Sequence, residues 1–194
     1  MSRDLEQKVK EGQASAGEQK KPPAPGRRAA VEFGVYAGIL VLVFVIFHCI
    51  LMLGRIPSES MEPTLMVHDW TVGNRLSYND DNPPERGDMI IFYSNEEETS
   101  MCKRVIGLAG EEVSFVGGHV YIDGAPLDES GYLDEDVATE CSETFVVPDG
   151  CVFVLGDNRE DSFDSRFWEN PYIEIEDIQS EIFFVLPFHR LPWF

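Results

Sequence analysis

Positive charge is scarce in most of this 194-residue chain. Residues 54–194 contain eight Lys and Arg against thirty Asp and Glu, which gives that part a formal net charge of −22. Proteins bind nucleic acids largely through Lys and Arg side chains that displace counterions from phosphates. The shortage therefore excludes nucleic acid as a main partner. Solubility and habitat explain the acidity most simply, and a specific cationic partner is the alternative.

Cysteine is also sparse and lacks the spacing of a metal site. The four residues, Cys49, Cys102, Cys141 and Cys151, form no CxxC pair and no His/Cys pattern typical of zinc. We therefore expect no metal and no cofactor. Cys141 and Cys151 are candidates for a disulfide that closes a short loop, which depends on a distance and an orientation that a sequence does not contain.

Only one hydrophobic run is long enough to cross a membrane. Residues 33–53 (FGVYAGILVLVFVIFHCILML) contain no Asp, Glu, Lys or Arg, and at 1.5 Å per residue they span roughly 30 Å. The apolar part of a cleaved signal peptide is shorter and ends at small residues. Residues 30–54 are therefore predicted to remain as a transmembrane anchor.

The charge on either side of this run predicts its orientation. Basic residues precede it, namely Lys20, Lys21, Arg27 and Arg28, and the basic side of an anchor faces the cytoplasm. Residues 1–29 are polar and lack apolar periodicity, so they are predicted to be a disordered cytoplasmic tail. Residues 55–194 are then expected outside the cytoplasmic membrane.

After the anchor the chain lacks sustained helical periodicity, and strand patterns replace it. Alternating or β-branched runs predict strands at 71–74, 88–93, 103–106, 112–116, 119–122, 144–147 and 151–155. Gly117-Gly118 and Pro148-Asp149-Gly150 indicate tight turns. Residues 58–66 are the one stretch that could start a short helix. The length suits one domain, and the pattern predicts a mainly antiparallel β fold.

The last apolar segment, residues 182–194, contains Pro187 and Pro192 and is too irregular to cross a bilayer. One interpretation is a core strand followed by a tail. The other places Trp193 and Phe194 on the membrane surface, where aromatic rings are favoured.

Lysine is the rarest charged residue in the presumed external domain, because Lys103 is the only lysine after residue 21. A serine hydroxyl becomes a useful nucleophile only when a base takes its proton. His68, His119 and His189 are possible bases, but none has a supporting motif. A neutral lysine is the alternative, and arginine cannot replace it because arginine stays protonated.

For Lys103 to act as a base, its pKa must fall from about 10.4 to about 7.5–8.5. The negative charge of the domain opposes that change, so burial of the amine has to dominate. Met101, Val105 and Ile106 are apolar neighbours suited to supplying it.

Four segments, taken in order, resemble the sequence boxes of bacterial type I signal peptidases. They are residues 57–65 (PSESMEPTL), 86–92 (RGDMIIF), 103–110 (KRVIGLAG) and 156–166 (GDNREDSFDSR). Each alone is a weak signal, but four in order behind an anchor are strong. The resemblance covers the chain from about residue 30 and implies an antiparallel β-sheet catalytic domain behind one transmembrane helix.

The resemblance implies a role for seven side chains. Ser60 corresponds to the nucleophile and Lys103 to the general base. Ser58, with the backbone N–H of Ser60, corresponds to the oxyanion donors. Ser162 matches the serine that orients the lysine amine, Asp164 and Arg166 match a supporting salt-bridged pair, and Met61 matches a residue beside the substrate pocket. For residues 157–159 a turn held by side-chain hydrogen bonds is at least as good an interpretation as direct chemistry.

The chain departs from the family pattern at three positions. Glu59 stands where glycine is frequent and puts an acid beside the nucleophile, with expected effects on pH dependence or on the charge of the entrance. Ala109 and Glu111 replace the more usual Pro and Asp, which concerns a turn more than catalysis. Large accessory insertions are not expected in so short a domain.

The resemblance implies a serine endopeptidase that removes amino-terminal signal peptides from exported preproteins, after small residues such as Ala-x-Ala. Its expected partners are those peptides and the lipid bilayer. A self-cleaving SOS-type repressor shares a Ser/Lys pair, but it needs a DNA-binding domain and no anchor. A membrane-tethered, non-catalytic binding module of a secretion system is the other alternative, which a cleavage assay distinguishes.

Overall fold

The computed structural model describes residues 25–79 and 82–188, and the chain divides into two compact units between Val43 and Phe44. The tail predicted for residues 1–24 lies outside the described residues. So do Trp193 and Phe194, and their predicted contact with a membrane surface therefore stays a prediction.

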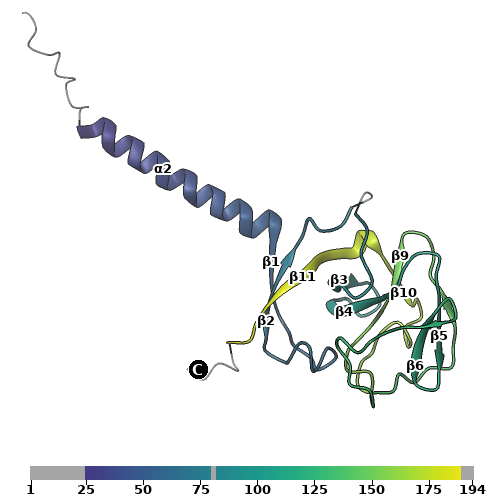
Figure 1. Ribbon diagram of the computed structural model, residues 1–194. Coiled ribbons are helices and arrows are strands. Elements are labelled where there is room, and N and C mark those ends of the chain that lie inside the picture. The colour runs from purple at the N-terminus through teal and green to yellow at the C-terminus, as the bar shows by residue number, and fades with distance from the viewer. Residues whose placement is uncertain (1–24, 80–81, 189–194) are drawn as a thin grey trace, which may run out of the picture. The chain divides into compact units, whose positions relative to one another are not determined.

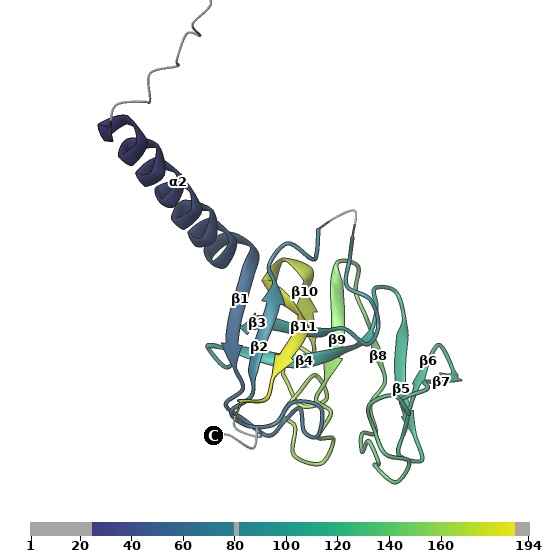
Figure 2. The same ribbon diagram turned by 60° about the vertical axis from the view of Figure 1, so that its left-hand side comes forward.

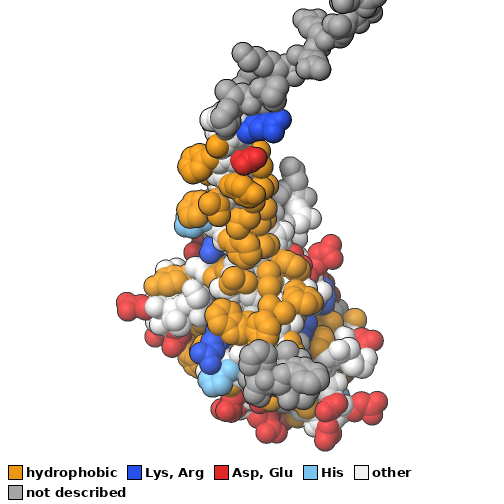
Figure 3. All heavy atoms as spheres, turned by 90° about the vertical axis from the view of Figure 1, so that its left-hand side faces the viewer, with side chains coloured by type: hydrophobic (Ala, Val, Ile, Leu, Met, Phe, Trp, Pro, Cys, Tyr) orange, Lys and Arg blue, Asp and Glu red, His pale blue; other side chains and the backbone are white. Residues whose placement is uncertain are grey.

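The first unit is the larger part of a long apolar helix. Helix α2 spans Pro25–Val45, and a π-helical turn, η1, continues it over Ile46–Ile50. Within it, Arg28–Ile50 is a 23-residue stretch with a mean hydropathy of 2.5, long enough to cross a membrane, and the most apolar part has no buried residue. Figure 3 shows hydrophobic side chains covering the helix. An apolar helix with no protein cover suits a hydrocarbon environment.

The helix differs from the predicted anchor, residues 30–54, at both ends. It begins at Pro25, because proline is well accommodated in a first helical turn. Residues Leu51–Arg55 are not helical but form strand β1, which pairs antiparallel with β2, from Leu51↔Asn74 to Arg55↔Trp70. Apolar Leu and Met suit either structure, and pairing with a distant strand decided between them.

The second unit contains two antiparallel sheets (Figure 1). The larger has the order β1-β2-β11-β3-β4-β9-β10, and the smaller has the order β7-β6-β5-β8. The remaining strands of the large sheet are β2 (Trp70–Asn74), β3 (Met89–Ser94), β4 (Thr99–Gly107), β9 (Cys151–Leu155), β10 (Tyr172–Glu174) and β11 (Ile178–Leu186). Those of the small sheet are β5 (Glu112–Val116), β6 (His119–Ile122), β7 (Ala125–Pro126) and β8 (Phe145–Val146). A short 3-10 turn, η2 (Ile175–Asp177), precedes β11.

The predicted mainly antiparallel β fold is confirmed, and all seven predicted strands are present. β5, β6 and β9 have the predicted bounds, whereas β4 is longer, because its first half pairs with β3. Strands β1, β7 and β10 were not predicted. The core-strand interpretation of the last apolar segment is confirmed as far as Leu186, since β11 pairs with both β2 and β3.

Two predicted turns are confirmed. Gly117 and Gly118 join β5 to β6 with φ values of 61° and 83°, a region that glycine tolerates, and Val116 pairs with His119. Gly150, with φ 75°, ends the turn before β9. Figure 2 shows the small sheet at one end of the domain, separate from β1 and β2.

The short helix predicted within residues 58–66 is wrong, because this stretch forms consecutive turns. Pro63 lies in its middle and disfavours a helical conformation at Glu62, the residue before it. The stretch is nonetheless well anchored: Met61 and Leu65 are 1% and 0% exposed and pack with Ile56, Ile91 and Ile182.

The predicted disulfide candidates are not bonded, since all four cysteines have free thiols. Cys141 and Cys151 both pack against the apolar cluster between the two sheets, which includes Ile106, Val113 and Phe153.

Candidate active site

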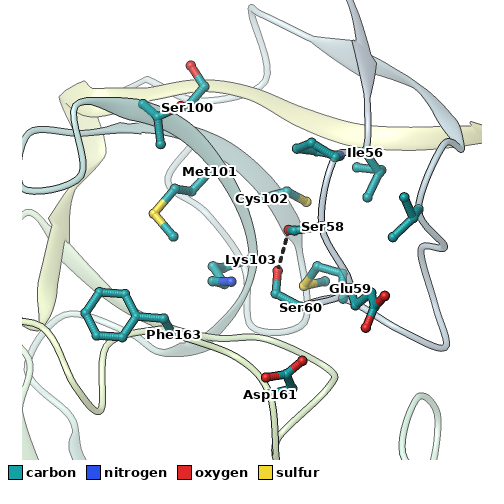
Figure 4. A pocket seen from close by; sticks show the side chains of 14 residues that line it. Ile56, Ser58, Glu59, Ser60, Ser100, Met101, Cys102, Lys103, Asp161 and Phe163 are labelled. Atoms are coloured by element: carbon teal, nitrogen blue, oxygen red, sulfur yellow. Dashed lines mark hydrogen bonds between the residues drawn. The ribbon is translucent and has the colours of Figure 1, made fainter.

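A cavity of about 550 Å³ lies between the turn after β1 and the first half of β4. Three segments surround it, and Figure 4 shows their side chains around it. The first contributes Ile56, Pro57, Ser58, Glu59, Ser60, Met61 and Val67; the second contributes Thr99, Ser100, Met101, Cys102 and Lys103; the third contributes Asp161 and Phe163.

Ser60 is held at the edge of this cavity by its backbone. Its carbonyl oxygen accepts a hydrogen bond from the backbone N–H of Asn158, at 3.1 Å. The amide of the Asn158 side chain donates to the carbonyl oxygen of Glu59, at 3.2 Å. The next side chain, Met61, is buried in the core. The position of the Ser60 hydroxyl is thus restricted by the two hydrogen bonds from Asn158 and by the burial of Met61.

Ser58 lies beside Ser60, with the two hydroxyl oxygens 3.5 Å apart, at the limit of a hydrogen bond. Both side chains line the cavity, and the dashed line in Figure 4 marks this contact.

Lys103 reaches the same cavity from β4, although only 2% of its surface is exposed. Burial is the largest influence on its pKa and lowers it from the ordinary value of 10.5. The carboxylate of Asp164 acts in the opposite direction but does not reverse the shift. Within the described part of the chain, Lys103 takes part in none of the salt bridges. Lys103 and Ser60 line the same cavity, and both are labelled in Figure 4.

Gly156 brings the third segment against Ser60. A Cβ atom at this position would overlap both the hydroxyl of Ser162 and the carbonyl oxygen of Ser60. The backbone of Ser60 and the Ser162 side chain therefore both pack against Gly156, which has no side chain. Ser162 is 4% exposed, and among the described residues its hydroxyl has no hydrogen-bond partner. The predicted role of Ser162 in orienting the lysine amine stays a prediction.

Asp164 and Arg166 form the ion pair that the resemblance predicted. Arg166 Nε donates to Asp164 Oδ1 at 2.8 Å, and both side chains are almost fully buried. Asp164 Oδ2 also accepts from the backbone N–H of Gly156, at 2.9 Å. The pair does not line the cavity but lies behind it, where it holds the glycine on which Ser60 and Ser162 pack.

A second buried ion pair, between Arg104 and Asp157, was not predicted. It is bidentate, with nitrogen–oxygen distances of 2.8 and 2.7 Å, and Arg104 also donates to the carbonyl oxygen of Gly87 at 2.7 Å. Similarly, Arg159 pairs with Glu129 at 2.6 Å. The interpretation of residues 157–159 as a turn held by side-chain hydrogen bonds missed these partners, because they are 30 to 53 residues away in the chain.

Glu111 supports a turn, as expected from its position outside the catalytic segments. It forms a bidentate pair with Arg86, at 2.9 and 2.6 Å, and accepts from the backbone N–H of Leu108 at 2.7 Å. It does not line the cavity.

The first half of β4 has an open edge at the cavity. β4 pairs with β3 from Thr99 to Arg104, but it pairs with β9 only from Arg104 to Gly107. One backbone edge of residues 99–103 is therefore without a strand partner among the described residues, and all five line the cavity. A strand was predicted only for residues 103–106, so the first half of β4 was missed, and only the sheet order identifies its unpaired edge.

Of the predicted site residues, the cavity brings together Ser58, Ser60, Met61 and Lys103. Ser162, Asp164 and Arg166 lie behind it. None of the described residues that line it is a histidine. Cys102, Asp161 and Phe163 also line the cavity but were not predicted to do so. Their position there depends on how segments that are distant in the sequence meet.

A family model described as "Signal peptidase, peptidase S26" matches residues 29–187. A signal peptidase I from Leptolyngbya laminosa is 44% identical over 121 residues, which cover 58% of each chain, so less than two thirds of that relative is matched. A probable signal peptidase I-2 from Synechocystis sp. (strain PCC 6803) is 35% identical, over 77% of this chain and 70% of its own length. A solved signal peptidase I from Enterococcus faecalis V583 is 30% identical with a TM-score of 0.46, covering 52% of this chain and 97% of that chain.

Proposed function

Because the chain belongs to the signal peptidase family, peptidase S26, we propose that it is a serine endopeptidase that removes amino-terminal signal peptides from exported preproteins. Ser60 is the nucleophile of this proposal and Lys103 its general base. The observation that carries it is the buried Lys103 amine, outside every described salt bridge and in the same cavity as a serine held by its backbone.

The low exposure of Lys103 supports its role as a base. Because burial lowers its pKa, a larger fraction of the amine is neutral near physiological pH than in an exposed lysine. The neutral amine takes the hydroxyl proton as the Ser60 oxygen attacks the scissile carbonyl carbon. It then passes the proton to the leaving nitrogen as the C–N bond breaks. Water hydrolyses the resulting ester and restores the serine.

The developing oxyanion needs donors fixed in advance. We assign this role to the Ser58 hydroxyl, 3.5 Å from the Ser60 oxygen, and to the backbone N–H of Ser60. Ser162 is the candidate for orienting the lysine amine during the reaction, because its buried hydroxyl has no other partner among the described residues. Asp164 and Arg166 act through Gly156 as positioning residues.

The open edge of β4 suits an extended substrate. Backbone groups of residues 99–103 can pair with the residues before the scissile bond, which gives affinity independent of sequence. Met61, which is 1% exposed, closes part of the cavity wall. The proposed substrates carry small side chains such as alanine before the cut, on the side where they contact this wall.

The lipid bilayer is the second proposed partner. The span Arg28–Ile50 anchors the chain, with its basic amino end in the cytoplasm and residues 55–194 outside the cytoplasmic membrane. Within the larger unit, apolar side chains of three neighbouring strands are exposed: Leu53 on β1, Trp70 on β2 and Phe184 on β11, at 50, 41 and 54%. Contact with lipid is consistent with such a surface.

The test is cleavage of a preprotein, or of a peptide with an Ala-x-Ala site, by the full chain purified in detergent. We expect cleavage after the second alanine, and its loss in both Ser60→Ala and Lys103→Ala. Loss in Ser60→Ala with full activity in Lys103→Ala refutes the assignment of the base. Binding of the peptide without any cleavage by the wild type favours a non-catalytic binding module instead.

A further inference from the structure

Two carboxylates at the cavity, Glu59 and Asp161, take part in none of the salt bridges among the described residues. Both side chains are exposed and both line the cavity; we call them the acidic rim. The arginines in the described salt bridges are already paired with other carboxylates, those of Glu111, Asp157, Glu129 and Asp164. The charge of the acidic rim therefore faces solvent and any bound substrate.

Asn158 binds the backbone of both residues of the acidic rim. Its side-chain amide donates to the carbonyl oxygen of Glu59 at 3.2 Å, and its own carbonyl oxygen accepts from the N–H of Asp161 at 3.2 Å. The same residue binds the backbone of Ser60. The two carboxylates are thus attached to the structure that positions the nucleophile, which keeps them close to the scissile bond.

The rim lies on the side of Ser60 where the leaving part of the substrate must be. If the residues before the cut pair with the open edge of β4, which ends at Lys103, the residues after the cut extend past Ser60. In Figure 4, Glu59 and Asp161 lie beyond Ser60, on the side away from Ser100. The nearest substrate groups are then the first residues after the scissile bond.

No positive charge in the cavity balances the rim. Lys103 is the one basic residue among its described linings, it is 98% buried, and it acts in its neutral form. Residues 54–194, which include the rim, have a formal net charge of −22. A cleft lined by one sign of charge raises the local concentration of groups of the opposite sign.

Building on the proposed function, we propose that the acidic rim selects substrates with Lys or Arg directly after the scissile bond and discriminates against Asp or Glu there. The exposed carboxylates attract a cationic side chain through water and repel an anionic one. Together they produce a preference in kcat/KM of about tenfold for Lys over Glu at low salt. Salt screens this preference, because the groups are exposed.

The experiment uses the full chain in detergent and three peptides that share an Ala-x-Ala site. They differ only in the residue directly after it, which is Lys, Gln or Glu. The expected order of kcat/KM is Lys, then Gln, then Glu, with a spread that shrinks between about 20 mM and 500 mM salt. The ratio of kcat/KM for two peptides at one pH does not depend on the protonation state of Lys103. That state belongs to the free enzyme and is the same for every peptide.

The double variant Glu59→Gln/Asp161→Asn is expected to bring the Lys/Glu ratio close to one. The matched control, Glu140→Gln/Glu143→Gln, removes the same charge from two exposed residues that do not line the cavity, and it should keep the wild-type ratio. Equal cleavage of all three peptides, or a ratio that survives in the rim variant, overturns the inference while the proposed function stands. Failure to cleave any of the peptides overturns both.

Discussion

Lys103 combines two properties that oppose each other, a chargeable amine and an exposure of 2%. Below its lowered pKa the native state must hold a buried ammonium ion, which costs free energy that the exposed lysine of the unfolded chain does not lose. That cost is full at low pH, declines as pH rises through the native pKa, and disappears above the ordinary value of 10.5.

Lys103→Met is therefore expected to abolish cleavage and to raise the free energy of unfolding at pH 7. The gain should shrink as the pH approaches 10.5, because the lysine of the unfolded chain then also becomes neutral. Urea denaturation at several pH values measures it, and wild-type kcat/KM is expected to rise with pH and level off below 10.5. A variant less stable than the wild type at pH 7 would contradict the account of burial.

Gly156 is a second residue whose role follows from contact distances. Gly156→Ala places a methyl group against Ser60 and Ser162, and we expect kcat to fall by about a hundredfold, since an error of about 1 Å in a reacting group has effects of that size. The control is Gly131→Ala, whose new Cβ has no heavy atom within 4 Å. Similar kcat values for the two variants would show that the turn carrying Ser60 tolerates displacement.

At the scale of elements, the Arg104–Asp157 pair joins β4 to the segment after β9. Asp157→Ala leaves the guanidinium of Arg104, 7% exposed, without its carboxylate. Loss of one partner of a buried pair costs about 3–5 kcal/mol, which thermal or urea denaturation measures. The exposed turn residue Asp149 supplies the control, because Asp149→Ala should change stability by less than about 0.5 kcal/mol. A cost for Asp157→Ala as small as that of the control would contradict a structural role for the pair.

The strand pattern was predictable where local sequence and tertiary pairing agree. β5, β6 and β9 carry clear apolar runs between turn residues, and their bounds were predicted correctly. β1 was predicted as part of the anchor, because Leu51, Met52 and Leu53 continue an apolar helix pattern equally well. Its pairing with β2, about 20 residues later, has no local signal.

At the scale of the whole molecule, the apolar span suits a hydrocarbon environment, whereas the acidic residues 54–194 suit water. Leu40 lies in the middle of α2 and is 70% exposed. Leu40→Arg adds about 3 kcal/mol to the cost of membrane insertion, and we expect a smaller membrane fraction on cell fractionation than for Leu40→Ala. Cleavage of a soluble peptide by detergent-purified protein should not change, since Leu40 is far in sequence from the cavity residues. Unchanged membrane partitioning of Leu40→Arg would contradict a spanning role for the helix.

The sequence by itself determined the family, the β class, one apolar span and the two residues proposed for catalysis. Short motifs and the rarity of lysine are local properties, so they can be read without coordinates. The ion pair of Asp164 with Arg166 was also predictable, because only one residue separates the two.

Tertiary structure alone decided which segments meet. Asn158 binds the backbone of residues 59 and 60 from almost 100 positions away. The open edge of β4 exists because β9 pairs with only its second half. The lowered pKa of Lys103 is caused mainly by burial. Desolvation and backbone pairing arise from contacts between distant residues, and no local pattern encodes them.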